Sequence, residues 1–285
     1  MIVVESLGML RKVCGQLEGP LGLVPTMGYL HAGHLSLIKQ AREQNASVGV
    51  SIFVNPTQFG PQEDLEAYPR ALDRDLRLLR AEGVDLVWTP KVQDVYPPGY
   101  QTWVTVDQIS QPLEGARRPG HFRGVATVVA KLLLAFQPQR AYFGQKDFQQ
   151  VRVIQRMVRD LGFPLEIVLC PTVRESDGLA MSSRNSYLNP GERSAASILY
   201  RALIAAKQAW EAGERDADLL RSVMLDVLNE EPLAHTEYVS VADPHSLEEL
   251  QGRISQAVCS MAVRMGKTRL IDNLLLGLDL NDLGR

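Results

Sequence analysis

The first half of the chain alternates short apolar segments with longer segments of helical periodicity, and this alternation limits the folds open to it. Apolar runs bounded by turn residues are typical of buried strands. Such strands, separated by amphipathic helices, form a parallel sheet that helices cover on both faces. The expected strands are residues 21–24, 48–54, 85–88, 141–143 and 165–169. The expected helices begin near 31–34 and cover 65–79, 122–136 and 148–161.

The pattern changes after Ser183. Helical periodicity covers 195–212 and 219–228, and three alternating stretches follow at 237–241, 255–263 and 268–274. Helices followed by a run of strands predict a smaller α+β unit. We therefore predict an α/β fold with two domains. Residues 1–183 form a Rossmann-like, doubly wound parallel sheet, and residues 184–285 form a smaller α+β domain that covers its ligand site.

Composition and charge narrow the partners and the compartment. A formal net charge of -3 over 285 residues argues against binding nucleic acid or an anionic membrane surface. No apolar run reaches the roughly 20 residues of a membrane span, and the first residues do not resemble a signal peptide. The three cysteines, Cys14, Cys170 and Cys259, are scattered and fit free thiols in a reducing compartment. We expect a cytoplasmic protein.

The segment 24–34 joins an expected strand to an expected helix through a glycine-containing turn. Such a junction aims backbone N–H groups and the positive end of a helix dipole at one point, which suits an anion. His31 and His34 share one helical face and are placed to hold phosphate oxygens or the charge that develops on them. Gly33 leaves room for a flat ring against the backbone. Taken alone, the two histidines fit structural packing or metal binding as well, although no zinc motif completes a metal site.

Other loops after expected strands carry polar groups. Asn55 and Gln58 suit the carboxylate or hydroxyl groups of a small substrate, although Asn-Pro alone is a turn signal. Lys146 supplies a positive charge at a helix start, where Asp147 is placed as a cap, although a tetrapeptide of this kind is more often a surface lysine beside an N-cap. Because ligands of parallel sheets bind beyond the carboxyl ends of the strands, we expect the loops 25–34, 55–58, 144–150 and 171–184 to converge.

Three further segments carry residues that are typical of phosphate sites. Residues 181–185, with two hydroxyls and a guanidinium, suit a polyphosphate in a loop that closes over it. The basic cluster 117–123 is more typical of a solvated face. Gly266-Lys267-Thr268 resembles the end of a P-loop, but Met261 stands where the leading glycine belongs, and the neighbouring residues alternate like a strand.

Five ordered motifs together point to one family. They are Pro-Thr-Met-Gly-x-Leu-His-x-Gly-His, Phe-Val-Asn-Pro-x-Gln-Phe, Arg-Pro-Gly-His-Phe, Phe-Gly-Gln-Lys-Asp and Met-Ser-Ser-Arg-Asn. The set resembles the pantothenate synthetases (pantoate–β-alanine ligases) over nearly the whole chain, including residues 238–243. His-x-Gly-His alone marks only the wider nucleotidyltransferase superfamily, so the specificity comes from the set.

The resemblance implies an AMP-forming ligase. Such an enzyme condenses (R)-pantoate with β-alanine to pantothenate through a pantoyl adenylate, and it releases AMP and pyrophosphate. ATP is then a co-substrate, Mg²⁺ accompanies it, and the chain forms a homodimer. Two other functions stay open at this point: a nucleotidyltransferase that stops at the nucleotidyl product, and an ATP-sensing protein without turnover.

The resemblance also implies roles for individual residues. Catalysis is implied for His34, His31 and Lys146, and binding of pantoate and β-alanine for Gln58, Gln150 and Asn55. Asp75 is the implied Mg²⁺ ligand, in a segment that departs from the family pattern at Ala71 and Arg74. The implied ATP-binding residues are Met27, Gly28, Tyr29, Leu30, His31, Ala32, Gly33, His34, Gly144, Gln145, Lys146, Asp147, Val173, Met181, Ser182, Ser183 and Arg184.

Overall fold

The computed structural model describes residues 1–61 and 63–283. Its contacts divide the chain into two compact units. The first contains Met1–Gly144 and Gln149–Cys170, and the second contains Gln145–Phe148 and the chain from Pro171 onward. Residues 171–183 thus lie with the second unit, whereas the sequence placed them in the first domain. The domain limits at 183 and 184, and the covering of a site, stay predictions.

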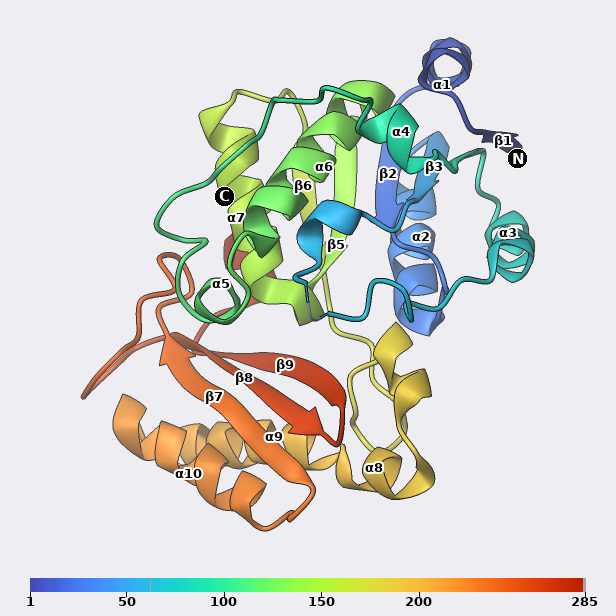
Figure 1. Ribbon diagram of the computed structural model, residues 1–285. Helices are drawn as coiled ribbons and strands as arrows, with labels where there is room; N and C mark the ends of the chain where they lie inside the picture. Colours follow the sequence, from blue (N-terminus) through green and yellow to red (C-terminus); the bar gives the residue numbers. More distant parts are fainter. Residues whose placement is uncertain (62, 284–285) are drawn as a thin grey trace. The chain divides into compact units, whose positions relative to one another are not determined.

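Six parallel strands form one sheet among the described residues of the first unit, in the order β1-β4-β3-β2-β5-β6 (Figure 1). The sequence had predicted every strand of this sheet except the first. The expectation of a Rossmann-like, doubly wound α/β fold is confirmed. The strands are β1 (Ile2–Val4), β2 (Leu21–Thr26), β3 (Ser47–Ile52), β4 (Leu86–Trp88), β5 (Arg140–Gly144) and β6 (Glu166–Cys170).

Helices cover both faces of this sheet, because alternate residues of each strand point to opposite sides. Leu23 and Phe143 lie in one core, with side chains of α1 (Leu7–Cys14), α6 (His121–Phe136) and α7 (Phe148–Asp160). Their chain neighbours Val24 and Tyr142 lie in the other core, with α2 (Ala32–Gln44) and α3 (Leu72–Ala81). Strands buried on both sides explain the continuous apolar runs of the sequence.

The strand order reverses between β2 and β5. β2 pairs with β3 from Leu21 to Thr26, but it pairs with β5 only at Gly22 and Leu23. Pro25, which has no N–H to donate, lies beyond that short pairing. Ligands of doubly wound sheets bind beyond the carboxyl ends of the strands at such a reversal. The turn that follows β2 therefore lies where doubly wound sheets bind their ligands.

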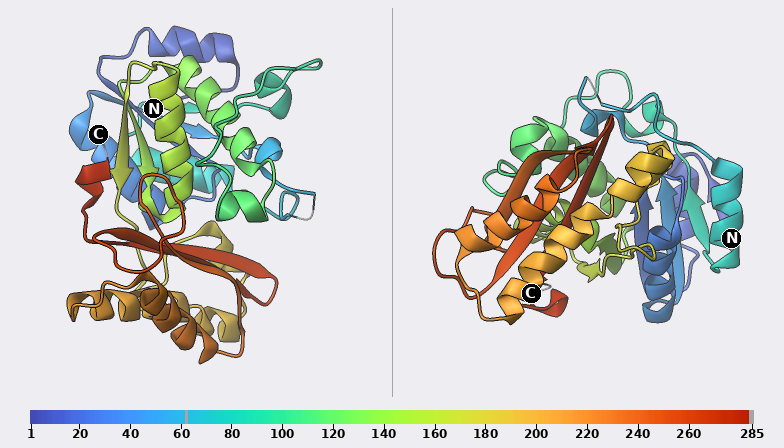
Figure 2. Two further views of the ribbon diagram at one scale, coloured as in Figure 1. Left: turned by 90° about the vertical axis from the view of Figure 1, so that its left-hand side faces the viewer. Right: turned by 90° about the horizontal axis from the view of Figure 1, so that it is seen from below.

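The second unit contains a small antiparallel sheet. In its described part three strands follow one another, β7 (Ala234–Ala242), β8 (Ala257–Met265) and β9 (Thr268–Leu276). Helices α9 (Ile198–Glu211) and α10 (Ala217–Asn229) pack on one face of it (Figures 1 and 2). Gly266, with φ +58°, and Lys267 form the two-residue turn between β8 and β9. This turn confirms that Gly-Lys-Thr is not a P-loop.

Among residues 1–61 and 63–283, no helix combines the length and apolar character needed to span a bilayer.

Several short elements connect the longer helices and strands. The short elements are α4 (Val92–Val95), α5 (Glu114–Arg117), α8 (Pro190–Ala195), η1 (Pro56–Gln58), η2 (Gln145–Asp147), η3 (Ser183–Tyr187) and η4 (Leu280–Leu283).

The helix expected over 65–79 was wrong at its start, because α3 begins only at Leu72. Pro69 disfavours helical geometry at Tyr68, the residue before it. The Arg70 guanidinium then donates to the carbonyl oxygens of Leu65 at 3.2 Å and Tyr68 at 3.1 Å, which stabilises a non-helical loop. The spacing of apolar residues alone does not reveal that the helix begins only after this loop.

Gly124 of α6 allows a close backbone contact with η1, and alanine there tests it. A Cβ at this position would lie 2.3 Å from the Thr57 carbonyl oxygen and 2.8 Å from the Gln58 Cα. We expect Gly124→Ala to lower the free energy of unfolding by about 1–3 kcal/mol through overpacking, although alanine is the better helix former. Urea denaturation measures the change.

The matched control is Gly8→Ala in α1, where no atom lies within 4 Å of the new Cβ. This variant is expected to be neutral or up to about 1 kcal/mol more stable, because alanine loses less backbone entropy on folding. Equal stability of the two variants would show that η1 and α6 do not pack this closely.

Candidate active site

The turn between β2 and α2 is held in a constrained shape. Gly28 and Tyr29 both have left-handed backbone angles, with φ +82° and +51°, and this region is uncommon for a residue such as tyrosine. The carboxylate of Asp75, from α3, accepts the N–H of Tyr29 at 2.7 Å and that of Leu30 at 2.9 Å, one with each oxygen. Asp75 is only 1% exposed. A buried carboxylate on α3 therefore fixes the turn that starts α2.

The two histidines at the start of α2 have the same tautomer. His31 is the N-cap of the helix, and its Nδ1 accepts the N–H of Gly33 at 3.2 Å. The Nδ1 of His34 accepts the N–H of His31 at 3.4 Å, and the ring centroids lie 4.1 Å apart. Because an accepting nitrogen carries no proton, each neutral ring is protonated on Nε2. The printed contacts of Nδ1 thus place the proton of each neutral ring on Nε2, close to the positive end of the dipole of α2.

Asn55, after β3, is used within the structure. It is 2% exposed, and its Nδ2 donates to Gln58 Oε1 at 3.0 Å and to the Gly124 carbonyl at 3.2 Å. Its Oδ1 accepts from the hydroxyls of Thr57 and Tyr96 at 2.9 and 3.0 Å. Both donors are engaged, so Asn55 orients Gln58 and does not present its own amide to a ligand.

Gln58 joins the loops after β2 and β3. Its Nε2 donates to the thioether sulfur of Met27 at 3.2 Å. A thioether is a weak acceptor, which an oxygen of a bound substrate would outcompete. Two loops that the sequence expected to converge therefore do meet within the first unit, at the carboxyl ends of neighbouring strands.

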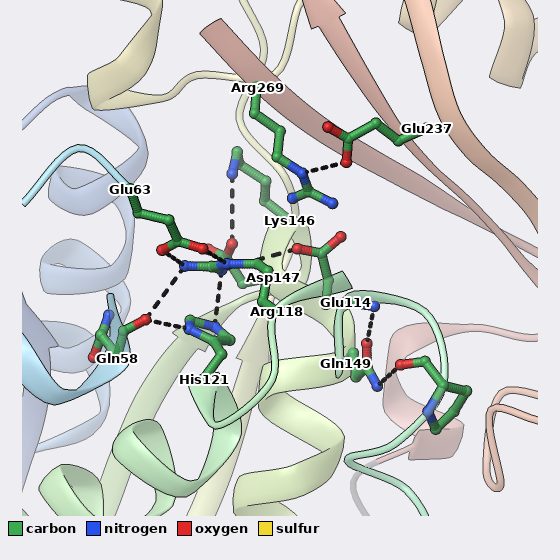
Figure 3. A network of polar contacts seen from close by, with 11 residues as sticks. Gln58, Glu63, Glu114, Arg118, His121, Lys146, Asp147, Gln149, Glu237 and Arg269 are labelled. Carbon is green, nitrogen blue, oxygen red and sulfur yellow. Dashed lines mark hydrogen bonds and ion pairs between the residues drawn. The ribbon is translucent and has the colours of Figure 1, made fainter. Parts of the chain in front are cut away.

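A network of polar side chains in the first unit contacts the Gln58 backbone (Figure 3). Arg118 donates to both oxygens of Glu63 at 2.7 Å, and its Nη1 lies 3.0 Å from His121 Nε2. His121 Nδ1 lies 2.8 Å from the Gln58 carbonyl oxygen. The side chain of Arg118 is only 14% exposed. The interpretation of 117–123 as a solvated face was therefore wrong for Arg118 and His121.

Burial and charge make His121 a neutral residue. Desolvation, and then the positive charge of Arg118, lower the pKa of His121 to about 4. For Glu63, burial raises the pKa, but the hydrogen bond and the charge of Arg118 outweigh it, and the pKa is lowered. An ionised Glu63–Arg118 pair thus stands beside an uncharged imidazole.

In the second unit, Asn273 of β9 holds the turn that carries Lys146. Its Nδ2 donates to the carbonyl oxygens of Gln145 at 2.9 Å and Lys146 at 2.8 Å. The Lys146 ammonium lies 3.5 Å from the Asp147 carboxylate. Next to Asn273, the buried Asp272 pairs with the guanidinium of Arg174 at 2.6 and 3.0 Å. The backbone of η2 is therefore fixed, while its lysine projects from it.

The loop 173–185 is also organised within the second unit. Met181 N–H donates to the Val173 carbonyl at 3.0 Å, which brings these two residues together. The Ser182 hydroxyl caps η3 by accepting the Arg184 N–H at 3.2 Å, and Ser183 is buried. The Ser182 hydroxyl thus has a structural task in addition to the role implied by the resemblance.

Two neighbouring glutamines have different tasks. The Gln149 amide is buried and bonds the Glu114 N–H and the carbonyls of Ile109 and Pro112, so it braces that loop. Gln150 is half-buried, and within residues 1–61 and 63–283 its amide makes no hydrogen bond to the protein. Gln150 is therefore the glutamine that is available to a ligand.

The residues around Asp75 do not fit a magnesium ion. Both oxygens of Asp75 accept backbone N–H groups, and the Arg74 guanidinium lies 3.7 Å from one of them. Mg²⁺ requires several oxygen ligands in octahedral geometry. Across the described part of the chain, no three His, Cys, Asp or Glu side chains are grouped as a metal site. The prediction that Asp75 binds Mg²⁺ has no support in this arrangement.

Comparison with known proteins identifies the family. The family model of the pantoate-beta-alanine ligases matches residues 2–275. The chain belongs to the pantoate–β-alanine ligase family. A pantothenate synthetase of Roseiflexus castenholzii is 59% identical over 276 residues, covering 97% of this chain and 99% of the relative. The chain is therefore an enzyme that ligates pantoate and β-alanine.

Solved structures of the family agree with the fold. The crystal structure of pantothenate synthetase from Thermus thermophilus has a TM-score of 0.92 and 48% identity, covering 96% of this chain and 99% of that one. A pantoate-beta-alanine ligase from Francisella tularensis, complexed with beta-gamma ATP and beta-alanine, has a TM-score of 0.80 and 35% identity. That match covers 98% of this chain and 99% of the other.

Several residues that hold the expected ligand loops within their own unit were not predicted for that role. Glu63 and Asn273 act through backbone or side-chain partners far away in sequence, and Asp75 was assigned to a metal. His121 lies in the Arg-Pro-Gly-His-Phe motif, so its signal was present but gave no role. The sequence holds no local signal for Glu63 or Asn273, because the partner of each lies far along the chain.

Asp75→Ala tests whether this carboxylate is structural. It leaves two amide N–H groups without their acceptor, so we expect a loss of about 2–3 kcal/mol in the free energy of unfolding. Asp73→Ala is the matched control, because Asp73 is an exposed acid in the same first turn of α3. Urea denaturation in a chelator and in Mg²⁺ should give the same loss, and a loss only in Mg²⁺ would restore the metal assignment.

The low pKa of His121 predicts acid sensitivity. Between pH 6.5 and about 4 the unfolded chain binds a proton at this residue that the folded chain does not bind, so stability falls as the pH falls. The full effect is about 3 kcal/mol. We expect the stability difference between the parent and His121→Asn to shrink or reverse over this range. A difference independent of pH would show that folded His121 titrates normally.

Proposed function

We propose that this ligase uses ATP and proceeds through a pantoyl adenylate. A carboxylate oxygen of (R)-pantoate attacks the α-phosphorus of ATP, and the bond to the bridging oxygen breaks to release pyrophosphate. The amine of β-alanine then attacks the acyl carbon, loses a proton and displaces AMP. The amide product is pantothenate. The complex of the Francisella tularensis ligase with beta-gamma ATP and beta-alanine supports this substrate set.

The observation that carries this proposal is the pair of Nε2–H donors of His31 and His34 at the start of α2. Negative charge grows on the phosphate oxygens as pyrophosphate leaves, and donors already aimed at such a point stabilise it. The dipole of α2 adds to that effect. We assign His34 and His31, with Lys146 as the mobile positive charge, to the transfer step.

The remaining assignments follow the resemblance and agree with the local structure. Gln58 and Gln150 bind pantoate and β-alanine directly, whereas Asn55 acts by holding Gln58. We propose no metal ligand at Asp75, and Mg²⁺, the homodimer and the cytoplasmic location stay predictions. The proposed ATP-binding residues are Met27, Gly28, Tyr29, Leu30, His31, Ala32, Gly33, His34, Gly144, Gln145, Lys146, Asp147, Val173, Met181, Ser182, Ser183 and Arg184.

Isotope exchange separates the ligase mechanism from its alternatives. Labelled pyrophosphate should exchange into ATP only when pantoate is present, and AMP should be released at a steady rate only when β-alanine is added as well. Exchange without pantoate would contradict adenylation of that acid. Turnover that yields ADP would show attack at another phosphorus.

Two substitutions of His34 test the role of its Nε2–H. The amide of glutamine reaches the position of Nε2, whereas the amide of asparagine ends near Nδ1. We expect His34→Asn to slow pantoate-dependent exchange by about 10²-fold, because a charge-stabilising donor is lost, and His34→Gln to lose less. Circular dichroism and thermal unfolding serve as the fold control. Equal rates for both variants would remove the Nε2–H from the mechanism.

A further inference from the structure

We propose that the imidazole of His121, in its neutral Nδ1–H form, is a positioning residue that sets Gln58 for pantoate. The inference rests on the proposed role of Gln58 as a pantoate ligand. His121 acts through the Gln58 backbone, and its own ring is not assigned to substrate.

The partners of His121 force one tautomer. A guanidinium offers only donors, so Arg118 Nη1–H donates to Nε2 across 3.0 Å. The Gln58 carbonyl offers only an acceptor, so the proton lies on Nδ1 and is donated across 2.8 Å. Both contacts are satisfied by the neutral ring alone, because a protonated Nε2 would face the N–H of Arg118. The contacts thus select the neutral ring with its proton on Nδ1.

Charges packed around His121 keep that form in place. Arg118 is bound by both oxygens of Glu63, and its Nη1 lies 3.9 Å from the Glu114 carboxylate. Arg118 is therefore held where its N–H meets Nε2. Burial also lowers the pKa of His121 to about 4, so the ring stays neutral near pH 7.

The Gln58 backbone needs this support. Gln58 is the last residue of η1, a 3-10 turn of three residues that is too short to be stable by itself. The Asn55 side chain and Gly124 fix one side of the turn. At its end, the Gln58 carbonyl is held by His121 Nδ1 at 2.8 Å and, over a longer contact of 3.4 Å, by Arg118 Nη2. When that carbonyl is held, the Gln58 amide is aimed by Asn55 Nδ2 and reaches Met27 with its Nε2. A rotation of the backbone would misplace this amide.

The test is a set of His121 variants that differ in where they place a donor. The asparagine amide reaches the position of Nδ1 and can still donate to the Gln58 carbonyl, the glutamine amide reaches that of Nε2, and phenylalanine has no donor. Pantoate-dependent exchange of pyrophosphate into ATP gives a KM for pantoate and a KM for ATP. We expect His121→Phe and His121→Gln to raise the KM for pantoate about tenfold with little change in that for ATP, and His121→Asn to recover most of the loss.

Two results would overturn the inference. One is a KM for pantoate in His121→Phe that is no higher than that in His121→Asn, because a packing role predicts that phenylalanine is tolerated at least as well. The other is an equal rise in the KM values for pantoate and ATP. His235→Phe, at an exposed histidine of β7, is the control for the substitution itself. If His121→Phe does not fold, Glu63→Gln replaces it. That change loosens Arg118 and should raise the KM for pantoate about threefold, whereas an unchanged KM contradicts the proposal.

Gln58→Ala separates this inference from the function on which it rests. A rise in the KM for pantoate in Gln58→Ala without a rise in His121→Phe would overturn the positioning role alone. An unchanged KM in Gln58→Ala would overturn the assignment of Gln58 to pantoate, and with it the positioning role.

Discussion

The turn between β2 and α2 keeps its shape because one buried carboxylate binds two of its backbone amides. Without Asp75, the N–H groups of Tyr29 and Leu30 would lose this acceptor, and in the interior such a loss costs more than an ordinary hydrogen bond contributes. The same contact offsets the unfavourable left-handed angle of Tyr29. Since α2 begins directly after this turn, the directions of His31 and His34 depend on it.

The three histidines of the first unit do not share one tautomer, because their neighbours differ. His31 and His34 accept backbone N–H groups on Nδ1, which leaves the proton on Nε2. His121 donates from Nδ1 to a carbonyl and accepts an Arg118 N–H on Nε2. In each ring the backbone or a guanidinium determines the protonated atom, so the chemistry of the imidazole is decided by the fold around it.

The sequence predicted all but the first strand of the described parallel sheet, because the signals of those strands are local. Apolar runs gave strands β2 to β6, and the glycine and histidines of the first loop marked the start of α2. The helix expected from residue 65 begins only at Leu72, because Pro69 and the hydrogen bonds of Arg70 favour a loop before it. The spacing of apolar residues carries no information about these two effects. Strand β1 and helix α1 were not predicted, although Ser6 caps that helix.

The tasks of single polar residues were harder to predict, because they depend on partners far along the chain. Asp75 reaches back to Tyr29 and Leu30, His121 to Gln58, and Asn273 to the turn of Lys146. Gln149 and Gln150 are adjacent and chemically identical, yet one braces a loop and the other is open to a ligand. Only the packing of the folded chain distinguishes such neighbours.

We propose that the loops around His34 transfer the adenylyl group of ATP to the pantoate carboxylate. Pantoate labelled with ¹⁸O in its carboxylate tests this most directly, with mass spectrometry of the nucleotide and phosphate products after one round of ligation. If the pantoate carboxylate is adenylated, AMP carries one labelled oxygen and pyrophosphate carries none, because the bridging oxygen leaves with AMP when β-alanine attacks. Label in orthophosphate, or AMP without label, would contradict it.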